Sequence, residues 1–556
     1  MQLTGAEILM ECLLEQGTDT IFGYPGGAVL PIYDAIYKYR DKLNHYLVAH
    51  EQWAAHAADG YARSTGKVGV CLATSGPGAT NLVTGIATAY MDSTPMVAIT
   101  GNVPLNMLGK DSFQEIDITG ITMPITKHNF IVKDVNILAD TLRQAFHIAR
   151  QGRPGPVLVD IPRDITVTTC EYQYKPPTNT VTETAGLTPQ ALEMATELLC
   201  NSQKPLIYAG GGVKSAEASL ELAQFAGQLA APVCVSAMGI GGLPHSNELF
   251  VGMIGMHGSE ASNTLATECD CLVAIGARFS DRVISNVSKF APHAKVLHID
   301  IDPAEINKNV LSTHFLVGDV KAALSRLNKL VDQKDRPEWL NRVRELKAKF
   351  PLKYTKTENE LKPQHIIQRI SALASDAIIT TEVGQHQMWT CQYLQVESPR
   401  KFITSGGLGT MGFGLGAAIG AAVGNPGTSV INISGDGCFR MNHIELATAV
   451  EYGLPIVVII INNHALGMVK QWQSLFLDGR YSHTSLYGKE TDFMKLAEAY
   501  KAKGYNVTKP QELDNAIKEA LALKKPAIIN CEINTDEKVF PMVPPGAGIN
   551  EYVLEA

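Results

Sequence analysis

Two groups of residues with oxygen-bearing side chains each follow a strongly apolar stretch of the sequence. Gly435-Asp436-Gly437 follows one stretch and Asn462-Asn463 the next, so that Asp436 and Asn463 are 27 positions apart (463 − 436). Segments 429–433 and 454–461 predict buried strands and 441–452 predicts a helix between them, which together make a βαβ unit. Because parallel strands end at the same edge of a sheet, the carboxylate and the amide would meet there, beside glycines, and could bind Mg²⁺ that bridges a diphosphate. Each half alone is also ordinary turn chemistry, and only the ordered pair at this spacing favours the metal site.

The bulk composition is typical of a soluble enzyme with several domains. The 556 residues are too many for one hydrophobic core and indicate about three or four domains. The hydrophobic share of 45% and the charged share of 18% are those of a well-packed globular chain. The net charge of −8, without any basic run, argues against a nucleic-acid partner.

The cysteines and the first residues bear on the location of the protein. Ten cysteines are scattered without a C-x-x-C pair, so we expect buried thiols in a reducing compartment rather than disulfides or a zinc site. Thr4-Gly5-Ala6-Glu7 predicts a capping box at the start of a helix, not a targeting segment. Every apolar run is shorter than the ~18 residues of a membrane span. We therefore expect a cytoplasmic protein with no membrane partner, although an organelle form without its transit peptide would have the same features.

The chain is expected to divide into three α/β blocks. Two polar stretches without periodicity, 172–186 and 349–363, are interpreted as linkers. The predicted domains are therefore 1–168, 187–345 and 362–556. A strand, a glycine-rich turn and a helix follow one another in both outer blocks, which allows two domains of similar doubly wound architecture with the middle block as a third parallel sheet.

Several further residues have both an ordinary and a chemical interpretation. Glu51 follows the predicted strand 44–48 and opens a helix, where a carboxylate normally only favours the helix dipole, but it could instead share a proton with a ring nitrogen of a ligand. Met411 could be a core methionine and Trp472 a large anchor on a helix face. Segment 276–282, after a predicted strand at 272–275, could be a charged turn.

Six motifs stand in the order found in one enzyme family. They are Gly23-Tyr24-Pro25-Gly26-Gly27-Ala28, His50-Glu51-Gln52, Thr74-Ser75-Gly76-Pro77-Gly78-Ala79-Thr80-Asn81, Phe113-Gln114-Glu115, Gly384-Gln385-His386-Gln387-Met388-Trp389 and Gly406-Gly407-Leu408-Gly409-Thr410-Met411-Gly412. With these motifs the chain resembles the catalytic (large) subunits of acetolactate synthase, or acetohydroxyacid synthase, which are thiamine diphosphate-dependent enzymes. The resemblance extends from Thr4 to about Tyr552, and the ordered set is far more specific than any single motif. It implies three doubly wound parallel-sheet domains: pyrimidine-binding, central FAD-binding and diphosphate-binding.

The resemblance implies a thiamine diphosphate site made by the two outer domains. Glu51 would be the carboxylate that partners the aminopyrimidine ring, the Gly409 carbonyl would accept from the ring's amino group, and Met411 would be the apolar wedge beneath the bent cofactor. Mg²⁺ would be held by two side chains and one backbone oxygen, those of Asp436, Asn463 and Ala465. The other expected contacts to this cofactor are Pro25, Gly26, Gly27, Gly76, Gly384, Gln385, His386, Gly435, Gly437 and Met468.

The central block is where the resemblance distinguishes close relatives. Flavin-free catabolic acetolactate synthases resemble this chain less there, so the resemblance implies FAD. The expected flavin contacts are Gly211, Gly212, Met256, His257, Arg278, Asp281 and Asp300. Because carboligation needs no net electron transfer, we expect this FAD to be structural.

The substrate pocket and the reaction are also implied by the resemblance. The enzyme would decarboxylate pyruvate and join the two-carbon unit to pyruvate or 2-ketobutyrate, in the biosynthesis of valine, leucine and isoleucine. Trp472 would pack against the second substrate, where one methylene is worth about 1–3 kcal/mol, and Arg282 would face both flavin and substrate. Gln114 and Lys127 are the other expected catalytic residues. The rest of the predicted pocket is Ala28, Phe113, Met468 and Val469.

The resemblance also bears on assembly. Family members supply the acid and the metal ligands from different subunits, so a homodimer or homotetramer is expected, with a small regulatory subunit as a further possible partner. Pro541 to Gly546 resembles the family's closing C-terminal arm. The chain departs from the usual pattern at Ala49, Trp53, Arg163 and Ser280. Trp53 replaces a glycine and is the most disruptive of these, because an indole one helical step from Glu51 should change the local packing.

Three alternatives remain open at this point. The first is another thiamine diphosphate enzyme, such as pyruvate oxidase, a glyoxylate carboligase or a flavin-free catabolic synthase. The second is a nicotinamide dehydrogenase, because residues 407–412 spell G-x-G-x-x-G. The third is a catalytically silent homologue.

Overall fold

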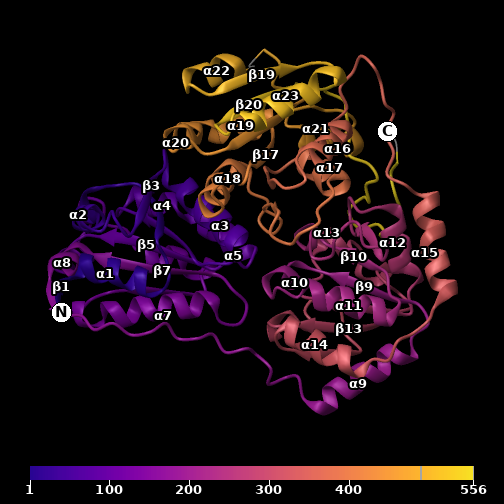
Figure 1. The fold of residues 1–556 in the computed structure, drawn as a ribbon, viewed down its shortest axis with the longest axis horizontal. Helices are drawn as coiled ribbons and strands as arrows, with labels where there is room; N and C mark the ends of the chain where they lie inside the picture. Colours follow the sequence, from indigo (N-terminus) through magenta and orange to yellow (C-terminus); the bar gives the residue numbers. More distant parts are fainter. Residues whose placement is uncertain (489–490, 555–556) are drawn as a thin grey trace.

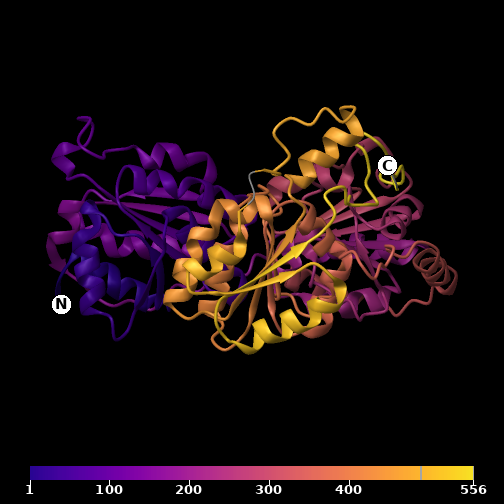
Figure 2. The ribbon, with the colours of Figure 1, turned by 90° about the horizontal axis from the view of Figure 1, so that it is seen from above.

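Three six-stranded parallel sheets and one small antiparallel pair organise the computed structural model, which describes residues 1–488 and 491–554. Helices flank all three sheets, as Figure 1 shows. The first domain lies at one end of the molecule, and this is clearest from above in Figure 2. The expected fold class, three doubly wound α/β domains, is confirmed.

The first and third sheets have the same topology. In the first, the strands run in the order β3 (Asn44–Leu47), β2 (Thr20–Gly23), β4 (Gly69–Ala73), β5 (Met96–Asn102), β7 (Pro156–Pro162) and β6 (His128–Ile131). In the third, the order is β16 (Phe402–Ile403), β15 (Ile378–Thr381), β17 (Val430–Gly435), β18 (Ile456–Asn462), β20 (Ala527–Glu532) and β19 (Lys503–Val507). Numbered within each sheet, both orders are 2-1-3-4-6-5. The similarity expected from the outer blocks of the sequence is therefore a shared fold.

The central sheet has a different order. Its strands are β11 (Phe250–Met253), β10 (Val233–Val235), β9 (Pro205–Ala209), β12 (Cys271–Ile275), β13 (Lys295–Asp300) and β14 (His314–Val317). Numbered within the sheet this order is 3-2-1-4-5-6, which is that of dinucleotide-binding domains. The small antiparallel pair, β1 (Gln2–Thr4) with β8 (Thr169–Glu171), joins the start of the first domain to its end.

Each sheet is covered by the helices of its own part of the chain. Around the first sheet lie α1 (Gly5–Glu15), α2 (Leu30–Lys38), α3 (Glu51–Thr65), α4 (Pro77–Asn81), α5 (Val83–Met91), α6 (Ile118–Thr122), α7 (Leu138–Arg150) and α8 (Arg163–Val167). The central part contains α9 (Pro189–Asn201), α10 (Gly211–Ser215), α11 (Ser219–Leu229), α12 (Glu260–Glu268), α13 (Asp281–Ile284), α14 (Val320–Leu330) and α15 (Pro337–Lys349). The last part contains α16 (Pro363–Leu373), α17 (Gln385–Tyr393), α18 (Phe413–Gly424), α19 (Asp436–Asn442), α20 (Leu446–Glu451), α21 (Gly467–Phe476), α22 (Phe493–Ala499) and α23 (Pro510–Ala522).

The strands are apolar because both faces of each sheet are covered. Along β4, Val70 and Leu72 belong to one hydrophobic cluster while Cys71 and Ala73 belong to another, as the alternation of a strand requires. All residues of β4, β5, β17 and β18 are buried, which explains their continuous apolar runs. In the described residues, no helix is both long enough and apolar enough to cross a membrane.

Helices α3 and α18 pack closely and join the first domain to the third. A Cβ at Gly60 on α3 would lie 2.1 Å from the Ala417 carbonyl oxygen, and one at Gly420 on α18 would lie 1.8 Å from the Ala57 carbonyl oxygen. These two glycines let the helix backbones touch. Trp53, whose bulk was expected to disturb this region, is accommodated because its ring lies over Gly416, where a Cβ would come within 3.2 Å of it.

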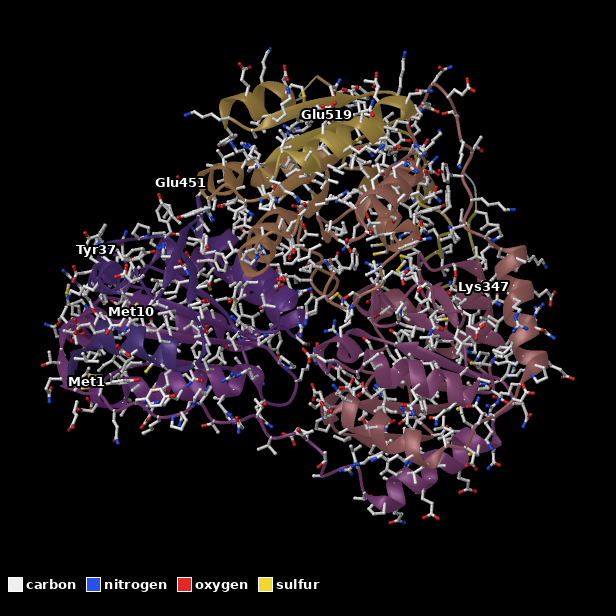
Figure 3. All side chains as sticks on the ribbon, in the orientation of Figure 1. Met1, Met10, Tyr37, Lys347, Glu451 and Glu519 are labelled. Carbon is white, nitrogen blue, oxygen red and sulfur yellow. The ribbon has the colours of Figure 1, made fainter. Side chains whose placement is uncertain are left out.

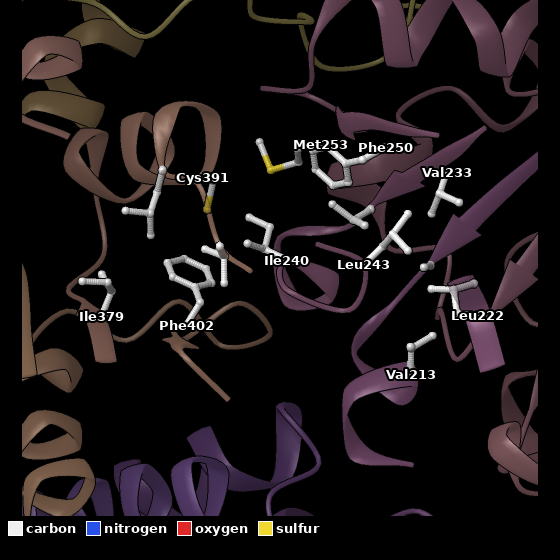
Figure 4. Packing of buried hydrophobic residues seen from close by; sticks show 14 of the residues in the cluster. Val213, Leu222, Val233, Ile240, Leu243, Phe250, Met253, Ile379, Cys391 and Phe402 are labelled. Atoms are coloured by element: carbon white, nitrogen blue, oxygen red, sulfur yellow. The ribbon is translucent and has the colours of Figure 1, made fainter. Parts of the chain in front are cut away.

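The central and third domains share one hydrophobic core. Ile240 and Met253 of the central domain lie opposite Cys391 and Phe402 of the third domain in Figure 4, and all four belong to one buried cluster. On the outer side of the central domain, Lys347 of α15, labelled in Figure 3, donates to the Phe250 carbonyl at 2.7 Å. The third domain also sends a C-terminal arm (533–554) across the central domain, where the Val543 N–H donates to the Met256 carbonyl at 2.8 Å.

The local predictions are mostly confirmed, with one correction. The capping box is present, with the Glu7 N–H donating to the Thr4 hydroxyl at 3.3 Å and the Thr4 N–H donating to Glu7 at 3.0 Å. Residues 172–186 and 350–362, all of them described, contain no helix or strand. The helix predicted at 441–452 is present, but it starts earlier, at Asp436, and a 3-10 turn at His443–Glu445 interrupts it. The interruption has a cause, since the Asn442 side chain is held by bonds to Glu382 and to the Gly412 carbonyl.

Candidate active site

The three groups of predicted site residues lie at corresponding places in the three sheets. In each sheet the strand order reverses direction between two neighbouring strands: β2 and β4, β9 and β12, β15 and β17. The loops after these strands diverge to opposite faces and leave a crevice at the carboxyl edge, which is where open α/β sheets bind ligands. Most of the predicted pyrimidine, flavin and diphosphate residues follow these six strands or their immediate neighbours, whereas Met256 and His257 follow β11 at the edge of the central sheet.

The first crevice contains Glu51. Its side chain is 8% exposed, and its Oε2 accepts a hydrogen bond from the Asn81 amide at 2.9 Å. A Cβ at Gly78 would lie 3.1 Å from Glu51 Oε1, so the glycine leaves space beside the carboxylate. Opposite it, the Ala28 N–H donates to the Thr74 hydroxyl at 3.3 Å. The structure therefore gathers the loop after β2 and the loop after β4 around one buried acid.

Glycines shape this crevice. A Cβ at Gly26 would lie 2.4 Å from the Thr74 side chain, and one at Gly76 would lie 2.9 Å from the Gln114 carbonyl oxygen. Gly76 has φ +61°, a conformation that favours glycine. The predicted residues Gly26, Ala28, Gly76 and Gln114 are thus brought together with Glu51, while Pro25 and Gly27 flank them in the chain.

The third crevice contains the candidate metal ligands. Asp436 is 3% exposed, its carboxylate accepts hydrogen bonds from backbone N–H groups including that of Asn463, and its Oδ1 has no hydrogen-bond partner. Burial raises the pKa of Asp436 to about 7. The Asn463 side-chain oxygen accepts from the Ala465 N–H at 3.2 Å, which folds this loop back upon Asn463. A cavity of about 360 Å³ lies beside Asp436, lined also by Arg440, Asn462 and His464.

The residues after β15 adjoin the same place. The Asn463 amide donates to Gln385 Oε1 at 2.9 Å, which ties the loop after β15 to the loop after β18. His386 lies against Gly435, where a Cβ would come within 2.9 Å of its Nδ1. Burial lowers the pKa of His386 to about 3, so its imidazole is neutral, and its Nε2 has no hydrogen-bond partner. The remaining predicted contacts here, Gly384, Gly437 and Met468, occupy the turns that begin α17, α19 and α21.

The loop 405–412 contains the predicted wedge, Met411. Both of its ends are anchored: the N–H groups of Gly406 and Gly407 donate to Asp92 of the first domain at 3.2 and 2.6 Å, and the Gly412 N–H donates to Glu382 at 2.8 Å. Between these anchors Gly409 is exposed and Met411 half-buried. The loop is therefore fixed at both of its ends.

The central crevice has the close backbone approach expected of a dinucleotide site. Gly276 (φ +54°) follows β12 and packs on Gly212 so tightly that a Cβ on Gly276 would lie 2.6 Å from the Gly212 Cα. Gly211 begins α10 beside it. Asp300, at the end of β13, is buried, which raises its pKa to about 6. His257, in the loop after β11, has its pKa lowered to about 4 by burial and its Nδ1 without a partner.

Two predicted catalytic residues meet at the boundary of the central and third domains. The Arg282 guanidinium lies over the Trp472 ring, 5.9 Å from its centroid, and also donates to the Met256 sulfur at 3.7 Å. Trp472 packs edge-on against Phe476 at 5.3 Å on α21. This contact joins the predicted flavin side of the pocket to its predicted substrate side. Val469, on the same helix, is exposed.

Other predicted residues lie apart from these groups. The Lys127 ammonium donates to the Ile148 and Gln151 carbonyls, both at 2.5 Å, at the C-terminal end of α7, and burial lowers its pKa to about 8. The Arg278 guanidinium donates to the Met91 carbonyl of the first domain at 2.7 Å. The Asp281 side chain is 82% exposed. Phe113, next to Gln114, is 89% exposed, an unusual position for a large aromatic ring.

Sequence reasoning did not single out three residues that organise the site. Asn81 was only quoted as the end of a motif, yet it holds Glu51. Glu382 directly follows β15, just as Asp436 directly follows β17, and this parallel position could have revealed it. Glu445 accepts the Ala49 and His50 N–H groups at 2.9 and 3.1 Å and so braces the turn before Glu51 from the third domain, a long-range contact that has no signal in the sequence.

The comparisons with known proteins agree with this arrangement. Residues 3–121, 192–327 and 382–531 match three family models in order: thiamine pyrophosphate enzyme, N-terminal TPP binding domain; central domain; and C-terminal TPP binding domain. The fold and these matches define the chain as a thiamine pyrophosphate enzyme.

Curated relatives narrow the family further. The probable acetolactate synthase large subunit of Methanocaldococcus jannaschii is 46% identical over 567 residues, which cover 99% of this chain and 95% of the relative. The acetolactate synthase large subunit of Haemophilus influenzae is 44% identical over 100% of this chain and 98% of its own length. That of Corynebacterium glutamicum is 46% identical over 98% and 89%. The chain belongs to the family of acetolactate synthase large subunits.

Proposed function

We propose that this protein is an acetolactate synthase that uses thiamine diphosphate, Mg²⁺ and FAD. It releases CO₂ from pyruvate and joins the remaining two carbons to a second 2-ketoacid, pyruvate or 2-ketobutyrate, for the biosynthesis of branched-chain amino acids. The observation that carries the proposal is the pair of corresponding crevices, one with a buried Glu51 and one with a buried, incompletely bonded Asp436, in a chain about 45% identical to named synthases over nearly its whole length.

The residues after β17 and β18 fit a magnesium ion. Asp436 offers a carboxylate, Asn463 an amide oxygen and Ala465 a carbonyl, all of them hard oxygen donors. The unpartnered Oδ1 of Asp436 is costly in a buried place, and a divalent cation would supply the missing charge. Among residues 1–488 and 491–554, no group of three His, Cys, Asp or Glu side chains is arranged for a metal. One carboxylate with neutral oxygens suits Mg²⁺ that completes its shell with a diphosphate and water.

The first crevice, which contains Glu51, fits the aminopyrimidine ring of thiamine diphosphate. Thiamine diphosphate, once bound, supplies a thiazolium that accepts the electron pair released when pyruvate loses CO₂. The role of Glu51 is to hold a proton at a ring nitrogen, and Asn81 keeps the carboxylate oriented for that purpose. Met411 of the loop 405–412 would support the ring, and the Gly409 carbonyl would accept a hydrogen bond from its amino group. Gln385 and the neutral His386 line the diphosphate end.

The orientation of helix α3 supports a site shared by two chains. Glu51 and Trp53 are two residues apart on α3, about 200° around the helix, so their side chains leave in nearly opposite directions. Trp53 contacts the loop that contains Met411, so Glu51 is directed away from Met411 of its own chain. We therefore propose a homodimer, or a tetramer of such dimers, in which Glu51 of one chain completes the Met411 site of the other. The exposed Phe113 and Leu408 supply apolar surface for that contact.

The central crevice fits a flavin dinucleotide. It lies where the 3-2-1-4-5-6 order reverses, and the close contact of Gly212 with Gly276 leaves room for a diphosphate beside the backbone. The predicted contacts Gly211, Met256, His257, Arg278, Asp281 and Asp300 follow strands of this sheet. Because Asp281 is exposed, its contact with FAD depends on α13 or its neighbours closing over the ligand.

The acceptor pocket is proposed around Trp472. Arg282, which lies over the indole, would neutralise the carboxylate of the second 2-ketoacid, while the indole itself would contact the alkyl end. Phe113, Gln114 and Lys127 are proposed to complete the pocket from the neighbouring chain, together with Ala28, Met468 and Val469. Lys127 would first have to exchange its two backbone carbonyl partners for substrate.

Two further proposals concern the setting of the enzyme. The relatives are named large subunits, and this supports a small regulatory subunit as partner. The composition supports a cytoplasmic location, with neither nucleic acid nor membrane as partner.

The experiment that tests the proposed function is product analysis. The purified chain is incubated with pyruvate, with and without thiamine diphosphate and Mg²⁺, and its visible spectrum is recorded. Acetolactate that forms only when both additions are present, from a protein with flavin absorbance, is the expected result. Acetyl phosphate or free acetate as main product, or turnover without thiamine diphosphate, would reject it.

A further inference from the structure

Helix α3 contacts the loop 405–412 through one side chain that the proposed chemistry does not use. Trp53, 7% exposed, donates its indole N–H to the Gly412 carbonyl at 2.9 Å. Gly412 directly follows Met411 and has φ +89°, a conformation that side-chain-bearing residues rarely adopt. The indole therefore reaches from the first domain to the turn that orients Met411.

The backbone groups on both sides of the Gly412 Cα are held by side chains. Its N–H donates to Glu382 at 2.8 Å, and its carbonyl accepts from Trp53 and, at 3.1 Å, from the Asn442 amide. Glu382 and Asn442 are themselves joined at 2.6 Å, and Glu382 also accepts the Leu415 N–H at 3.0 Å, which begins α18. Both torsion angles of Gly412 are thus fixed by a closed, fully buried network.

The part of the loop between the anchors has few contacts of its own. Leu408 is 45% exposed, Gly409 is exposed and Met411 is half-buried. The Thr410 hydroxyl is paired with the Thr88 hydroxyl of the first domain at 2.7 Å. The first domain therefore holds this segment on both sides of Met411, through Thr88 at Thr410 and through Trp53 at Gly412.

We propose that Trp53 is a positioning residue, which together with Glu382 holds Gly412 so that Met411 and the Gly409 carbonyl are placed to receive the ring end of thiamine diphosphate. This inference rests on the proposed function. It predicts that the bond from Trp53 affects binding of the ring end, while the diphosphate end, held by Asp436 and Gln385, is unaffected.

The test compares two tryptophan variants. Trp53→Phe keeps a large aromatic ring and removes the N–H donor. Trp339→Phe is the matched control, because Trp339 is also buried and donates its indole N–H to the Pro205 carbonyl at 2.9 Å, in the central domain far from the loop. Calorimetric titrations measure the Kd of thiamine diphosphate and of inorganic pyrophosphate, both with Mg²⁺, and a thermal scan gives the Tm.

One neutral hydrogen bond corresponds to a change in Kd of about two- to tenfold. Trp53→Phe is expected to raise the Kd of thiamine diphosphate by that factor and to leave the Kd of pyrophosphate unchanged. Its Tm should be close to that of Trp339→Phe. In Trp339→Phe both Kd values should equal those of wild type. Slower hydrogen–deuterium exchange at the thiazolium C2 of the bound cofactor should accompany the change.

Two results would overturn the inference. Equal loss of both ligands in Trp53→Phe would mean that the indole only stabilises the third domain, and unchanged binding of both would mean that Gly412 does not need it. If Trp53→Phe does not fold, Asn442→Ala removes the other donor to the same carbonyl and is measured in the same way. If wild type itself does not bind thiamine diphosphate, the proposed function is rejected rather than the role of Trp53.

Discussion

Replacing Glu51 by glutamine removes the proton-holding group and little else. The Asn81 amide, which donates to Glu51 Oε2 at 2.9 Å, can donate equally to the glutamine oxygen. The side chain keeps its length and its buried position beside Gly78. Any large effect of Glu51→Gln therefore comes from the lost acid and not from a changed crevice.

The expected loss can be estimated from the function of the group. A positioned acid or base contributes roughly 10²- to 10⁴-fold to a rate, which corresponds to about 3–5.5 kcal/mol of transition-state stabilisation. Turnover of pyruvate should fall by that factor, whereas the Kd of thiamine diphosphate should change by less than about tenfold, because one hydrogen bond is exchanged for another. The Tm should stay within a few degrees of wild type, since a single weakened hydrogen bond costs only about 1 kcal/mol.

The control is another buried glutamate close by. Glu445 accepts the N–H groups of Ala49 and His50 through Oε1 and the Thr448 hydroxyl at 2.8 Å through Oε2. Glu445→Gln can keep all three contacts and has no access to a ring nitrogen, so its turnover should stay within about threefold of wild type. Steady-state production of acetolactate and calorimetric titration of the cofactor measure both variants. Full turnover in Glu51→Gln, or equal loss in the two variants, would refute the proton-holding role.

Three other changes test separate parts of the account. Trp472→Leu should shift the ratio of the 2-ketobutyrate to the pyruvate product by about five- to a hundredfold while CO₂ release from pyruvate is spared, and an unaltered ratio would contradict the proposed pocket. Gly276→Ala should lose flavin absorbance, because its Cβ would lie 2.6 Å from the Gly212 Cα. The control Gly427→Ala also has a positive φ but open space around its Cβ, so it should retain the flavin. Flavin retained in both variants would count against the proposed flavin crevice. Burial lowers the pKa of Lys214 in the folded chain to about 7, whereas its pKa in the unfolded chain is near 10.5. Between pH 7 and pH 10.5 the unfolded chain therefore binds a proton at Lys214 that the folded chain does not bind. The free energy of unfolding of wild type rises with pH in that range. Lys214→Met should therefore be more stable than wild type by about 2–4 kcal/mol at pH 7 and below, and the advantage should shrink toward pH 10. A difference in stability that does not change with pH would show that the lysine stays charged.

The sequence predicted those parts of the fold that depend on local pattern. Continuous apolar runs such as that of β18 gave the buried parallel strands, because both faces of these sheets are covered. The ordered motifs supplied the family, and Asp436 and Asn463 do follow neighbouring parallel strands, as their spacing predicted. The assignments of individual site residues remain predictions.

The rest depends on contacts between distant segments. The helix after Asp436 is interrupted because Asn442 is bonded to Glu382, 60 residues away in the chain. The tolerance of Trp53 depends on Gly416 of another domain, and Lys127 lies beside carbonyls of α7 that no motif indicated. Such pairs have no periodic signal in one sequence, so only the assembled fold reveals them.

The most direct test of the shared site combines two inactive variants in one dimer. Chains with Glu51→Gln and chains with Asp436→Ala are given different tags, coexpressed and purified as the mixed dimer. If Glu51 of one chain works with Asp436 of the other, the mixed dimer has one intact site and one doubly altered site, and should show about half of the wild-type turnover. A mixed dimer no more active than either parent would contradict the account, because each chain would then have to complete its own site.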